Sequence, residues 1–207
     1  HHKINREACK TLIYPDNMPQ RSYQYSIIKK SIFHNLLCAL PTGLGKTFIA
    51  SVMMLNWYRW TEDTKIVFLA PTRPLVLQQA EACYRIVGLP RKDTGVLIGG
   101  TKSVTFREEL YKSVRVLFMT PHILENDIKR GIIDPKSFVC VIVDEAHHAT
   151  GGHAATKAVR QILEVNPSVR IMALTATPGS TIESVQTVID NLNISAIDMR
   201  TETNIDI

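Results

Sequence analysis

The stretch ALPTGLGKTFIA, residues 39–50, joins an apolar run to a turn with two glycines and then to a second apolar run. A strand, a glycine-bearing turn and a helix together direct backbone N–H groups and the positive helix end at one point, which suits an anion. Gly43 and Gly45 let the backbone close around phosphates. Lys46 would reach the β- and γ-phosphates, and Thr47 would offer a hydroxyl to Mg²⁺. The alternative is an ordinary strand–helix turn with a chance GKT.

The composition is that of a soluble globular chain with a mild basic excess. Its 207 residues are 45% hydrophobic and 21% charged, with a net charge of +5, so one large domain is expected. This charge permits a nucleic-acid partner but does not require one. The acidic tail from Glu183 onward is expected to be a solvated exit from the domain. The chain shows no signal peptide and no apolar stretch near 18 residues, so no membrane span is expected.

The four cysteines lie far apart in the sequence and have no metal-ligand spacing. We interpret them as reduced core residues of an intracellular protein. They are Cys9, Cys38, Cys83 and Cys140.

Short apolar runs alternate with helical patterns along the chain. Runs such as FVCVIVD, residues 138–144, are continuous rather than alternating, which is typical of strands buried on both faces of a parallel sheet. The helical stretch at residues 73–88 carries one apolar stripe and ends at Gly88. The alternation predicts a doubly wound α/β domain. The strands are expected at residues 36–40, 66–70, 95–98, 114–120, 138–144 and 171–175.

Four of these strands end in chemically distinctive stretches: PTGLGKT, PTRP, DEAHH and TATPGS. Ligands of open α/β sheets bind outside the carboxyl ends of the strands. Because the sheet is parallel, all four stretches are expected at one edge. This convergence is stronger support for a functional site than any single motif.

DEAHH, residues 144–148, places two carboxylates at the end of a buried strand, which is costly unless they meet a cation. Asp144 fits the role of a Mg²⁺ carboxylate, and Glu145 would position and deprotonate an attacking water. A strand end that caps the next helix is the alternative. The histidines His147, His148 and His153 could suggest zinc, but no cysteine or fourth ligand is near, and metal binding by them is disfavoured.

PTGLGKT, APTRP, DEAH and TATP, in this order, resemble motifs I, Ia, II and III of superfamily 2 helicases, over nearly the whole chain. YPDNMPQRSYQ, residues 14–24, resembles the region that recognises adenine. Leu40 departs from the glycine that GxxxxGK[ST] requires, as helicase-type loops commonly do. Together with WYRW, TPHILENDIKRG and DEAHHATG, the motifs look most similar to the Fanconi anaemia group M branch, which includes archaeal Hef and fungal DNA-repair translocases.

The resemblance implies a RecA-like P-loop NTPase fold, with a mostly parallel sheet sandwiched by helices. It divides the chain into an N-terminal segment with the adenine-recognising region at residues 1–34, an ATP-binding domain at residues 35–195 and an exit linker at residues 196–207. The aromatic cluster Trp57, Tyr58 and Trp60 is expected to pack or to contact a domain rather than to stack on bases. It lies at the far end of the helix that starts at the phosphate loop.

The resemblance also assigns roles to individual residues. Those expected to bind ATP are Arg21, Gln24, Thr42, Gly43, Leu44, Gly45, Lys46 and Thr47. The expected catalytic residues are Lys46, Asp144, Glu145 and His147, and the Mg²⁺ ligands are Thr47 and Asp144. The stretch expected to couple hydrolysis to strand movement is Thr175, Ala176 and Thr177. The expected contacts to the DNA backbone are Thr72, Arg73, Gly100, Thr101, Thr120 and Pro121.

By resemblance, the chain is the first motor domain of a nuclear ATP-dependent 3′-to-5′ DNA helicase that remodels forks, displacement loops and Holliday junctions in DNA repair. DNA and a second RecA-like domain of the same polypeptide are the expected partners, and DNA-repair proteins are further candidates. The second domain would carry arginine fingers in a QxxGRxGR-like motif, which this chain lacks, so the isolated domain is expected to be nearly inactive. The alternatives are an RNA-directed superfamily 2 ATPase, a non-catalytic nucleotide- or nucleic-acid-binding module and a P-loop kinase or metabolic ATPase.

Overall fold

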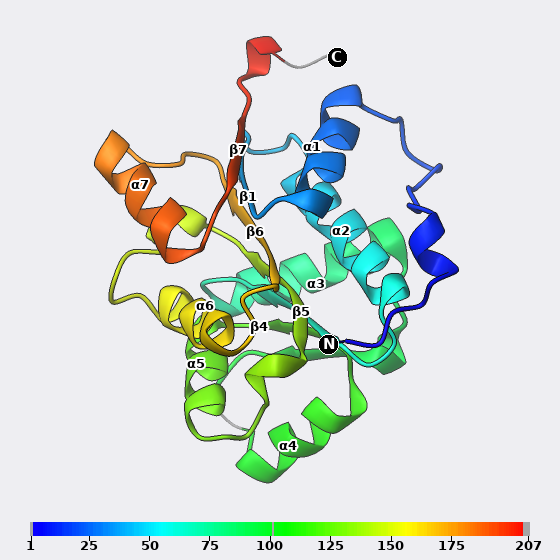
Figure 1. Ribbon diagram of the computed structural model, residues 1–207, viewed down its shortest axis with the longest axis vertical. Coiled ribbons are helices and arrows are strands. Elements are labelled where there is room, and N and C mark those ends of the chain that lie inside the picture. Colours follow the sequence, from blue (N-terminus) through cyan, green and yellow to red (C-terminus); the bar gives the residue numbers. More distant parts are fainter. Residues whose placement is uncertain (1, 101, 205–207) are drawn as a thin grey trace.

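A seven-stranded parallel sheet forms the centre of the molecule (Figure 1). The computed structural model describes residues 2–100 and 102–204. The strand order is β3-β4-β2-β5-β6-β1-β7, and each neighbouring pair is parallel. All carboxyl ends therefore open on one edge. The strands are β1 Leu36–Ala39, β2 Lys65–Leu69, β3 Thr94–Leu97, β4 Val116–Met119, β5 Phe138–Val143, β6 Arg170–Thr175 and β7 Ala196–Met199.

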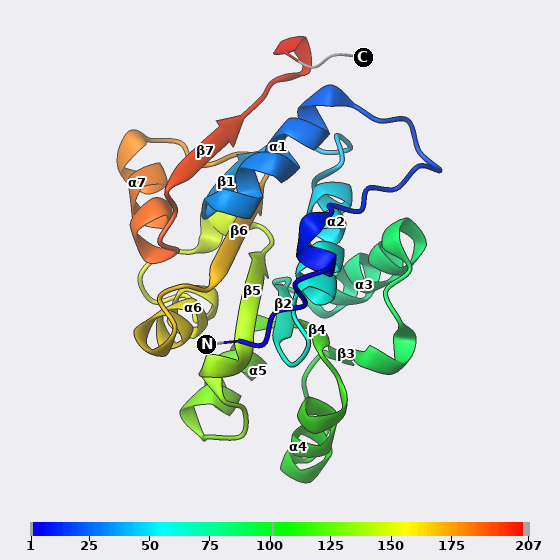
Figure 2. The ribbon, with the colours of Figure 1, turned by 45° about the vertical axis from the view of Figure 1, so that its right-hand side comes forward.

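Helices cover both faces of the sheet (Figures 1 and 2). One hydrophobic cluster joins one face to α1 Ser22–Phe33, α2 Lys46–Trp60 and α3 Arg73–Val87. A second cluster joins the other face to α4 Val104–Ser113, α5 Pro121–Lys129, α6 Ala154–Val165 and α7 Ile182–Asn191. Short 3₁₀ turns complete the described chain: Ala8–Lys10, Arg91–Asp93, Pro135–Ser137, Ala146–His148 and Glu202–Asn204.

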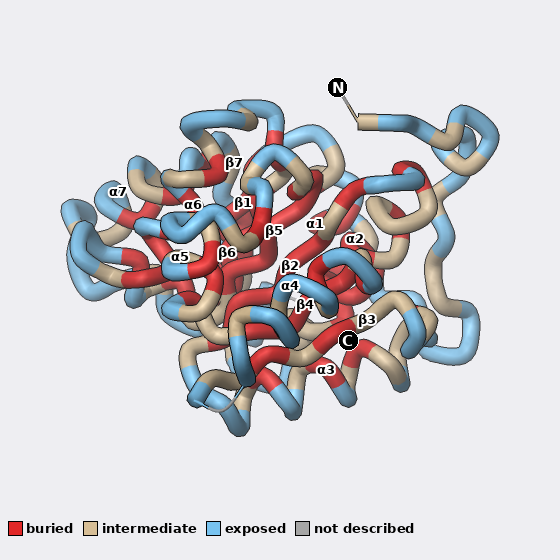
Figure 3. Tube along the Cα trace, turned by 90° about the horizontal axis from the view of Figure 1, so that it is seen from below, coloured by how far each residue is buried: buried red, intermediate tan, exposed pale blue. Residues whose placement is uncertain are grey.

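The strand β5 shows why the apolar runs are continuous. Cys140 and Ile142 point into the cluster under α1–α3, whereas Val141 and Val143 point into the cluster under α5–α7. Since side chains alternate between the faces of a strand, a strand covered on both faces needs apolar residues at every position. The buried segments follow the central strands, with exposed segments around them (Figure 3).

The fold class is the one that the sequence predicts. A doubly wound parallel α/β domain of RecA-like type is confirmed, and the six predicted strands all form with ends shifted by two residues at most. The helix expected at residues 73–88 is α3. Its N-cap Thr72 accepts a hydrogen bond from the Leu75 N–H at 3.4 Å, and it ends at Gly88, whose φ of 62° is left-handed.

The exit linker expected from residue 196 is wrong in its first part, because Ala196–Met199 forms β7 and pairs with β1. The pattern of this edge strand is inverted: Ile197 and Met199 are exposed, whereas Asp198 is only 5% exposed. Asp198 forms ion pairs with Lys30 and Arg200, both at 2.9 Å. Because the buried residue is acidic and its neighbours are exposed, the hydrophobic pattern did not predict this strand. The expectation that the acidic tail is solvated is therefore wrong at Asp198.

The cysteine prediction holds for three residues of four. Cys38, Cys83 and Cys140 are buried free thiols, and burial raises the pKa of the Cys38 thiol to about 12. Cys9 is exposed and free instead, because its short 3₁₀ turn lies outside both hydrophobic clusters. Among the residues described here, no helix is both long and apolar enough to cross a membrane.

The aromatic cluster at the end of α2 packs within the domain, as expected. The rings of Trp57 and Trp60 meet edge to face at 5.2 Å between centroids. The Trp60 indole N–H donates to the Thr11 carbonyl at 3.0 Å, and the Tyr58 hydroxyl donates to Asp93. These contacts attach the N-terminal segment and the turn before β3 to the amino-terminal side of the sheet.

Candidate nucleotide-binding and coupling site

The loop between β1 and α2 has the backbone that a phosphate cradle requires. Gly43 and Gly45 adopt left-handed φ values of 86° and 94°, which glycine reaches without steric cost. Gly45 is the N-cap of α2, so the positive end of that helix faces the loop. A Cβ on Gly45 would overlap the side-chain amide of Gln24. Glycine at this position therefore serves both the turn and the close approach of α1.

The Lys46 ammonium lies against its own loop. Its Nζ donates to the carbonyl oxygens of Leu40 at 2.6 Å and Pro41 at 3.3 Å. Burial lowers the pKa of Lys46 below its ordinary value, because two carbonyl dipoles replace only part of the lost hydration. An anion delivered into the loop would offset this desolvation.

Gln79 on α3 links the two predicted Mg²⁺ ligands. The Thr47 hydroxyl donates to Gln79 Oε1 at 2.7 Å, and Gln79 Nε2 donates to Asp144 Oδ2 at 3.5 Å. A hydroxyl and a carboxylate are oxygen ligands of the kind that Mg²⁺ prefers, so the donor set fits this ion. Gln79 was missed by the sequence analysis, although it lies one helical turn after the buried Val76.

Asp144 and Glu145 follow β5 directly and differ in environment. The Asp144 carboxylate accepts the Glu145 backbone N–H at 3.0 Å, yet desolvation by burial raises the pKa of Asp144 to about 6. Glu145 is partly exposed and has a left-handed φ of 50°, which is strained for a residue with a side chain. The Asp144 carboxylate thus lies close to the sheet edge, whereas the Glu145 carboxylate is turned outward.

Replacing Asp144 with asparagine is expected to stabilise the nucleotide-free chain at pH 7. A carboxyl group whose folded-state pKa is about 6 and whose unfolded value is about 3.9 binds a proton on folding. The protonated carboxyl causes no penalty below pH 4, and the penalty grows as the pH rises to 6. Its size is on the order of 2 kcal/mol, so the melting temperature should rise by a few degrees.

Thermal melts at pH 4 and pH 7 without Mg²⁺ measure this effect. The two proteins should melt alike at pH 4 and differ at pH 7. Asp16→Asn, at an exposed position, removes the same charge and serves as the control. Equal melting temperatures of D144N and the parent chain at both pH values would contradict the prediction.

His147 connects the DEAH stretch to the end of β6. Its Nδ1 lies 2.9 Å from the Thr175 hydroxyl, which itself donates to the Thr177 carbonyl at 2.6 Å. Since that hydroxyl proton is already used, the histidine must be the donor, and its Nε2 lone pair then faces Glu145 Oε2 at 3.6 Å. Burial lowers the pKa of His147. The neutral ring is thus hydrogen-bonded to the TAT stretch, residues 175–177, and lies beside the Glu145 carboxylate without a hydrogen bond to it.

The predicted adenine-binding region packs directly on the phosphate loop. Gln24 and Tyr23, at the start of α1, are 7% and 1% exposed. The Tyr23 hydroxyl and the Gln24 amide donate to the Leu44 carbonyl at 2.7 and 3.2 Å. Arg21 is exposed and lies 3.5 Å from the Tyr23 hydroxyl. Tyr23, which the sequence analysis missed, holds the phosphate loop through its hydrogen bond to Leu44. Recognition of adenine by Gln24 and Arg21 remains a prediction.

The predicted DNA contacts lie after three neighbouring strands of the same edge. Thr72 and Arg73 follow β2 and begin α3. Gly100 follows β3, and Thr101 lies outside the described residues. Thr120 and Pro121 follow β4 as the N-cap and first residue of α5. The strand order places these loops side by side, away from the phosphate loop that follows β1.

The histidine cluster needs no metal to account for its geometry. Ligand atoms of Glu145, His147 and His148 lie within 4.8 Å of one another. Thr175 already engages one nitrogen of His147, and the His148 ring packs on those of His147 and His153 at 4.0 and 6.2 Å. The expectation against zinc remains a prediction.

The fold and this edge define a RecA-like domain of the helicase type, with the P-loop after the strand β1. Residues 17–180 match the family described as "Type III restriction enzyme, res subunit", and the chain belongs to this family.

Two curated relatives span the whole chain. They are the ATP-dependent DNA helicase mph1 of Aspergillus fumigatus, which is 54% identical over 208 residues, and MPH1 of Saccharomyces cerevisiae, which is 53% identical. The chain covers 19% and 21% of their lengths, so it spans about a fifth of these relatives.

Among solved structures, the helicase domain of Pyrococcus furiosus Hef superposes with a TM-score of 0.81 at 35% identity. That match covers 97% of this chain and 40% of the Hef chain. A DEAD box protein from Methanococcus jannaschii, at 22% identity and a TM-score of 0.72, covers 89% of this chain and 51% of that one, and it supports the fold alone. The resemblance to the Hef-containing branch is thereby confirmed.

Proposed function

We propose that this chain is the first motor domain of an ATP-dependent 3′-to-5′ DNA helicase or translocase that remodels branched DNA during repair in the nucleus. The relatives are named ATP-dependent DNA helicases, and the chain covers only part of them. Movement along DNA is therefore proposed for a longer polypeptide, in which a second RecA-like domain closes the ATP site.

The observation that carries the proposal is the link from His147 to Thr175. It hydrogen-bonds the histidine of the DEAH stretch to the end of β6 at 2.9 Å, on the same edge as the phosphate loop and the predicted strand contacts. An ordinary nucleotide-binding module has no need of a polar connection between the residues that follow its carboxylates and a neighbouring strand end. A motor needs one, because hydrolysis must change the contacts that hold the nucleic acid.

In this proposal each residue has a separate task. Lys46 leaves the loop carbonyls for the β- and γ-phosphates, and the glycine turn surrounds them. Thr47 and Asp144 would hold Mg²⁺, which neutralises phosphate charge when bound. Glu145 orients and deprotonates the attacking water.

A neutral His147 would sense the protonation of the outward carboxylate. It holds an Nε2 lone pair toward the Glu145 carboxylate, so a proton or water between the two acceptors would satisfy both. Arrival of that proton changes the partner of the ring, and the change passes to Thr175 through the Nδ1 hydrogen bond.

Replacing Arg73 with alanine is expected to weaken binding of single-stranded DNA about fivefold. Arg73 is the first residue of α3 on the ligand edge, and loss of one phosphate contact should make the slope of log K against log salt about 0.7 less steep. Arg85→Ala is the matched control. It removes the same charge at the opposite end of α3, where Arg85 is exposed near Glu81.

Anisotropy of a labelled DNA strand at several salt concentrations measures both quantities, and an RNA strand of the same sequence is titrated in parallel. Equal losses in R73A and R85A would show that only net charge matters and would contradict the interface. Clearly tighter binding of RNA, with the same dependence on Arg73, would favour the RNA-directed alternative.

A further inference from the structure

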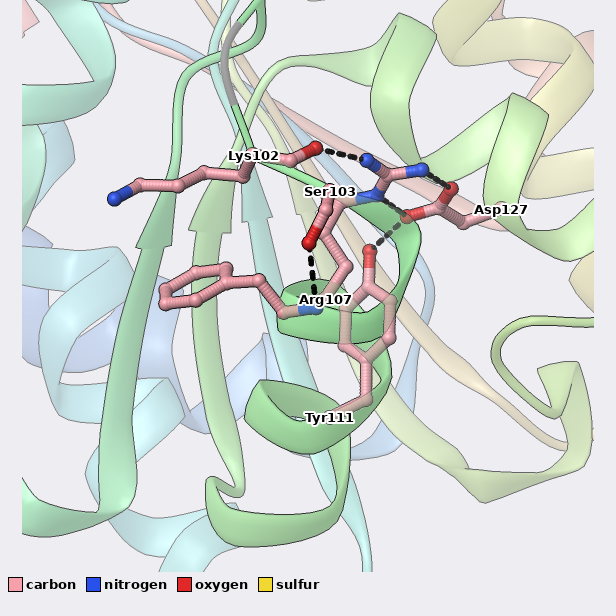
Figure 4. Close-up of polar contacts among 6 residues, drawn as sticks. Lys102, Ser103, Arg107, Tyr111 and Asp127 are labelled. Atoms are coloured by element: carbon pink, nitrogen blue, oxygen red, sulfur yellow. Dashed lines mark hydrogen bonds and ion pairs between the residues drawn. The ribbon is translucent and has the colours of Figure 1, made fainter.

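Asp127 and Asp144 are both shielded from solvent, but they differ in how their charge is balanced. Asp127, on α5, is 1% exposed, and it accepts from Arg107 Nε at 2.8 Å, Arg107 Nη2 at 2.9 Å and the Tyr111 hydroxyl at 2.6 Å (Figure 4). The arginine fork pairs the charge and occupies both carboxylate oxygens. Asp127 is thus the centre of a complete structural bridge that holds α4, which carries Arg107 and Tyr111, against α5.

Asp144 has no cationic partner of this kind. In the part of the chain that the structure describes, its carboxylate forms no ion pair. Its donors there are two neutral groups, the Glu145 backbone N–H on Oδ1 at 3.0 Å and the Gln79 amide on Oδ2 at 3.5 Å. The Lys46 ammonium is turned to the carbonyls of its own loop. Because a shielded carboxylate is costly without a cation, Asp144 is suited to an ion that the chain itself does not supply.

The side-chain amide of Gln79 has one orientation that satisfies both of its neighbours. Its Oε1 accepts the Thr47 hydroxyl at 2.7 Å, and its Nε2 donates to Asp144 Oδ2. A flipped amide would place its oxygen against the carboxylate, where neither atom is a donor. The Thr47 hydroxyl proton is therefore directed at Gln79, and the lone pairs of that hydroxyl are left for another partner.

The packing of α3 on α2 holds this amide in place. Thr47 and Gln79 form one contact between the two helices. Ser51 and Cys83, each one turn further along its own helix, lie beside each other as well. Ala80, next to Gln79, is 3% exposed and belongs to the hydrophobic cluster on this face. The position of the Gln79 side chain is thus set by the core, so an apolar side chain of the same length can take its place.

We propose that Gln79 is a positioning residue for the divalent cation of the nucleotide site. Its amide fixes the Thr47 hydroxyl and the Asp144 carboxylate so that the remaining lone pairs of both groups face one ion. The proposal rests on the function proposed above. Loss of a partner that orients metal ligands lowers metal affinity by about 10- to 100-fold. Mg²⁺ requires nearly ideal octahedral geometry, whereas Ca²⁺ accepts a flexible one, so ligand orientation matters most for Mg²⁺.

Gln79→Met tests this role, because it keeps the length of the side chain and removes both polar ends. The affinity for a labelled nonhydrolysable ATP analogue is measured in EDTA, in Mg²⁺ and in Ca²⁺. The gain in affinity that Mg²⁺ gives the parent chain should fall about tenfold in Q79M. The gain from Ca²⁺ should fall less, and the affinity in EDTA should stay the same. Gln78→Met changes the adjacent, exposed glutamine of the same helix and should bind as the parent chain does.

Three further variants separate positioning from stability. Tyr111→Phe removes one hydrogen bond from the bridge at Asp127, so it should lower the melting temperature and leave the Mg²⁺ gain unchanged. Gln79→Asn keeps an amide that is one methylene too short for both partners, and it should lose the gain as Q79M does. Thr47→Val removes the hydroxyl that Gln79 orients. In a T47V background, Q79M should therefore reduce the remaining gain by much less than tenfold, because coupled residues are not additive.

The outcomes separate this proposal from the proposed function. No binding of the analogue by the parent chain would contradict both. An equal Mg²⁺ gain in Q79M and the parent chain, or no gain in either, would overturn the role of Gln79 and leave nucleotide binding standing. An equal loss of affinity in EDTA and in Mg²⁺ would show that Gln79 only supports the loop. A full loss in the T47V background would show that it acts without Thr47, and each of these two results would also overturn the proposal.

Discussion

Lys46→Ala is expected to lower the affinity of the chain for a nonhydrolysable ATP analogue by at least about 30-fold. Truncation of one partner of a buried, hydrogen-bonded charge pair costs about 2–5 kcal/mol, and each 1.4 kcal/mol is tenfold. The Lys46 ammonium is partly desolvated, which lowers its pKa, and its partners are the loop carbonyls of Leu40 and Pro41. Bound phosphates would give the ammonium fully charged partners in place of these carbonyl oxygens.

Fluorescence titration of a labelled analogue with and without Mg²⁺ measures this loss. Lys112→Ala, at an exposed position on α4, removes the same side chain far from the phosphate loop and should bind as the parent chain does. Circular dichroism and a melt of K46A establish that the loop variant is folded. Unchanged affinity in a folded K46A would favour a non-catalytic module over a motor.

The isolated chain is expected to turn over ATP about 10³–10⁵ times more slowly than the same chain joined to a second RecA-like domain with arginine fingers. Arginine fingers supply this factor in related phosphoryl transfers by stabilising charge on the transferred group. The chain contains Lys46, Asp144 and Glu145 for its half of the site, but no QxxGRxGR-like segment. We therefore expect the chain to bind the phosphates but to leave the transition state without a cation on the open side.

Steady-state phosphate release, with and without forked DNA, measures turnover of both proteins. In the joined protein, an arginine-to-alanine change at the finger should return turnover to the level of the isolated chain. Glu145→Gln in the joined protein should abolish turnover and retain binding of ATP. Robust DNA-stimulated hydrolysis by the 207-residue chain alone would contradict the expectation.

The positions of the four motifs were predictable, because in a parallel sheet every loop that follows a strand lies at the same edge. Each motif was expected at a carboxyl end, and the register of β1, β5 and β6 brings those ends to one edge. The glycine positions followed from turn chemistry. Lys46, Thr47 and Asp144 could be named as candidates because their spacing matches a known arrangement, and their roles remain predictions.

The sequence analysis missed three features, because their roles depend on tertiary contacts. Gln79 lies on a helix that carries an apolar stripe, and only packing of α3 against the P-loop brings it between Thr47 and Asp144. Asp127 has no motif around it, and its arginine partner is 20 residues away. The strand β7 has apolar residues outside and an aspartate inside, so its apolar residues did not mark the face that is buried. For Gln79, the sequence did offer a signal, because this polar residue lies one helical turn after the buried Val76.

The pairing of β7 with β1 has a mechanical consequence. The two strands run in the same direction, with Leu36 opposite Ala196 and Ala39 opposite Met199. Tension applied to the chain beyond Met199 acts along this strand, so it loads all the interstrand hydrogen bonds together instead of opening them one at a time. The ion pair of Asp198 with Lys30 extends the same load to α1. Force from the C-terminal side would thus arrive, through one strand pair and one helix, at both the phosphate loop and Gln24.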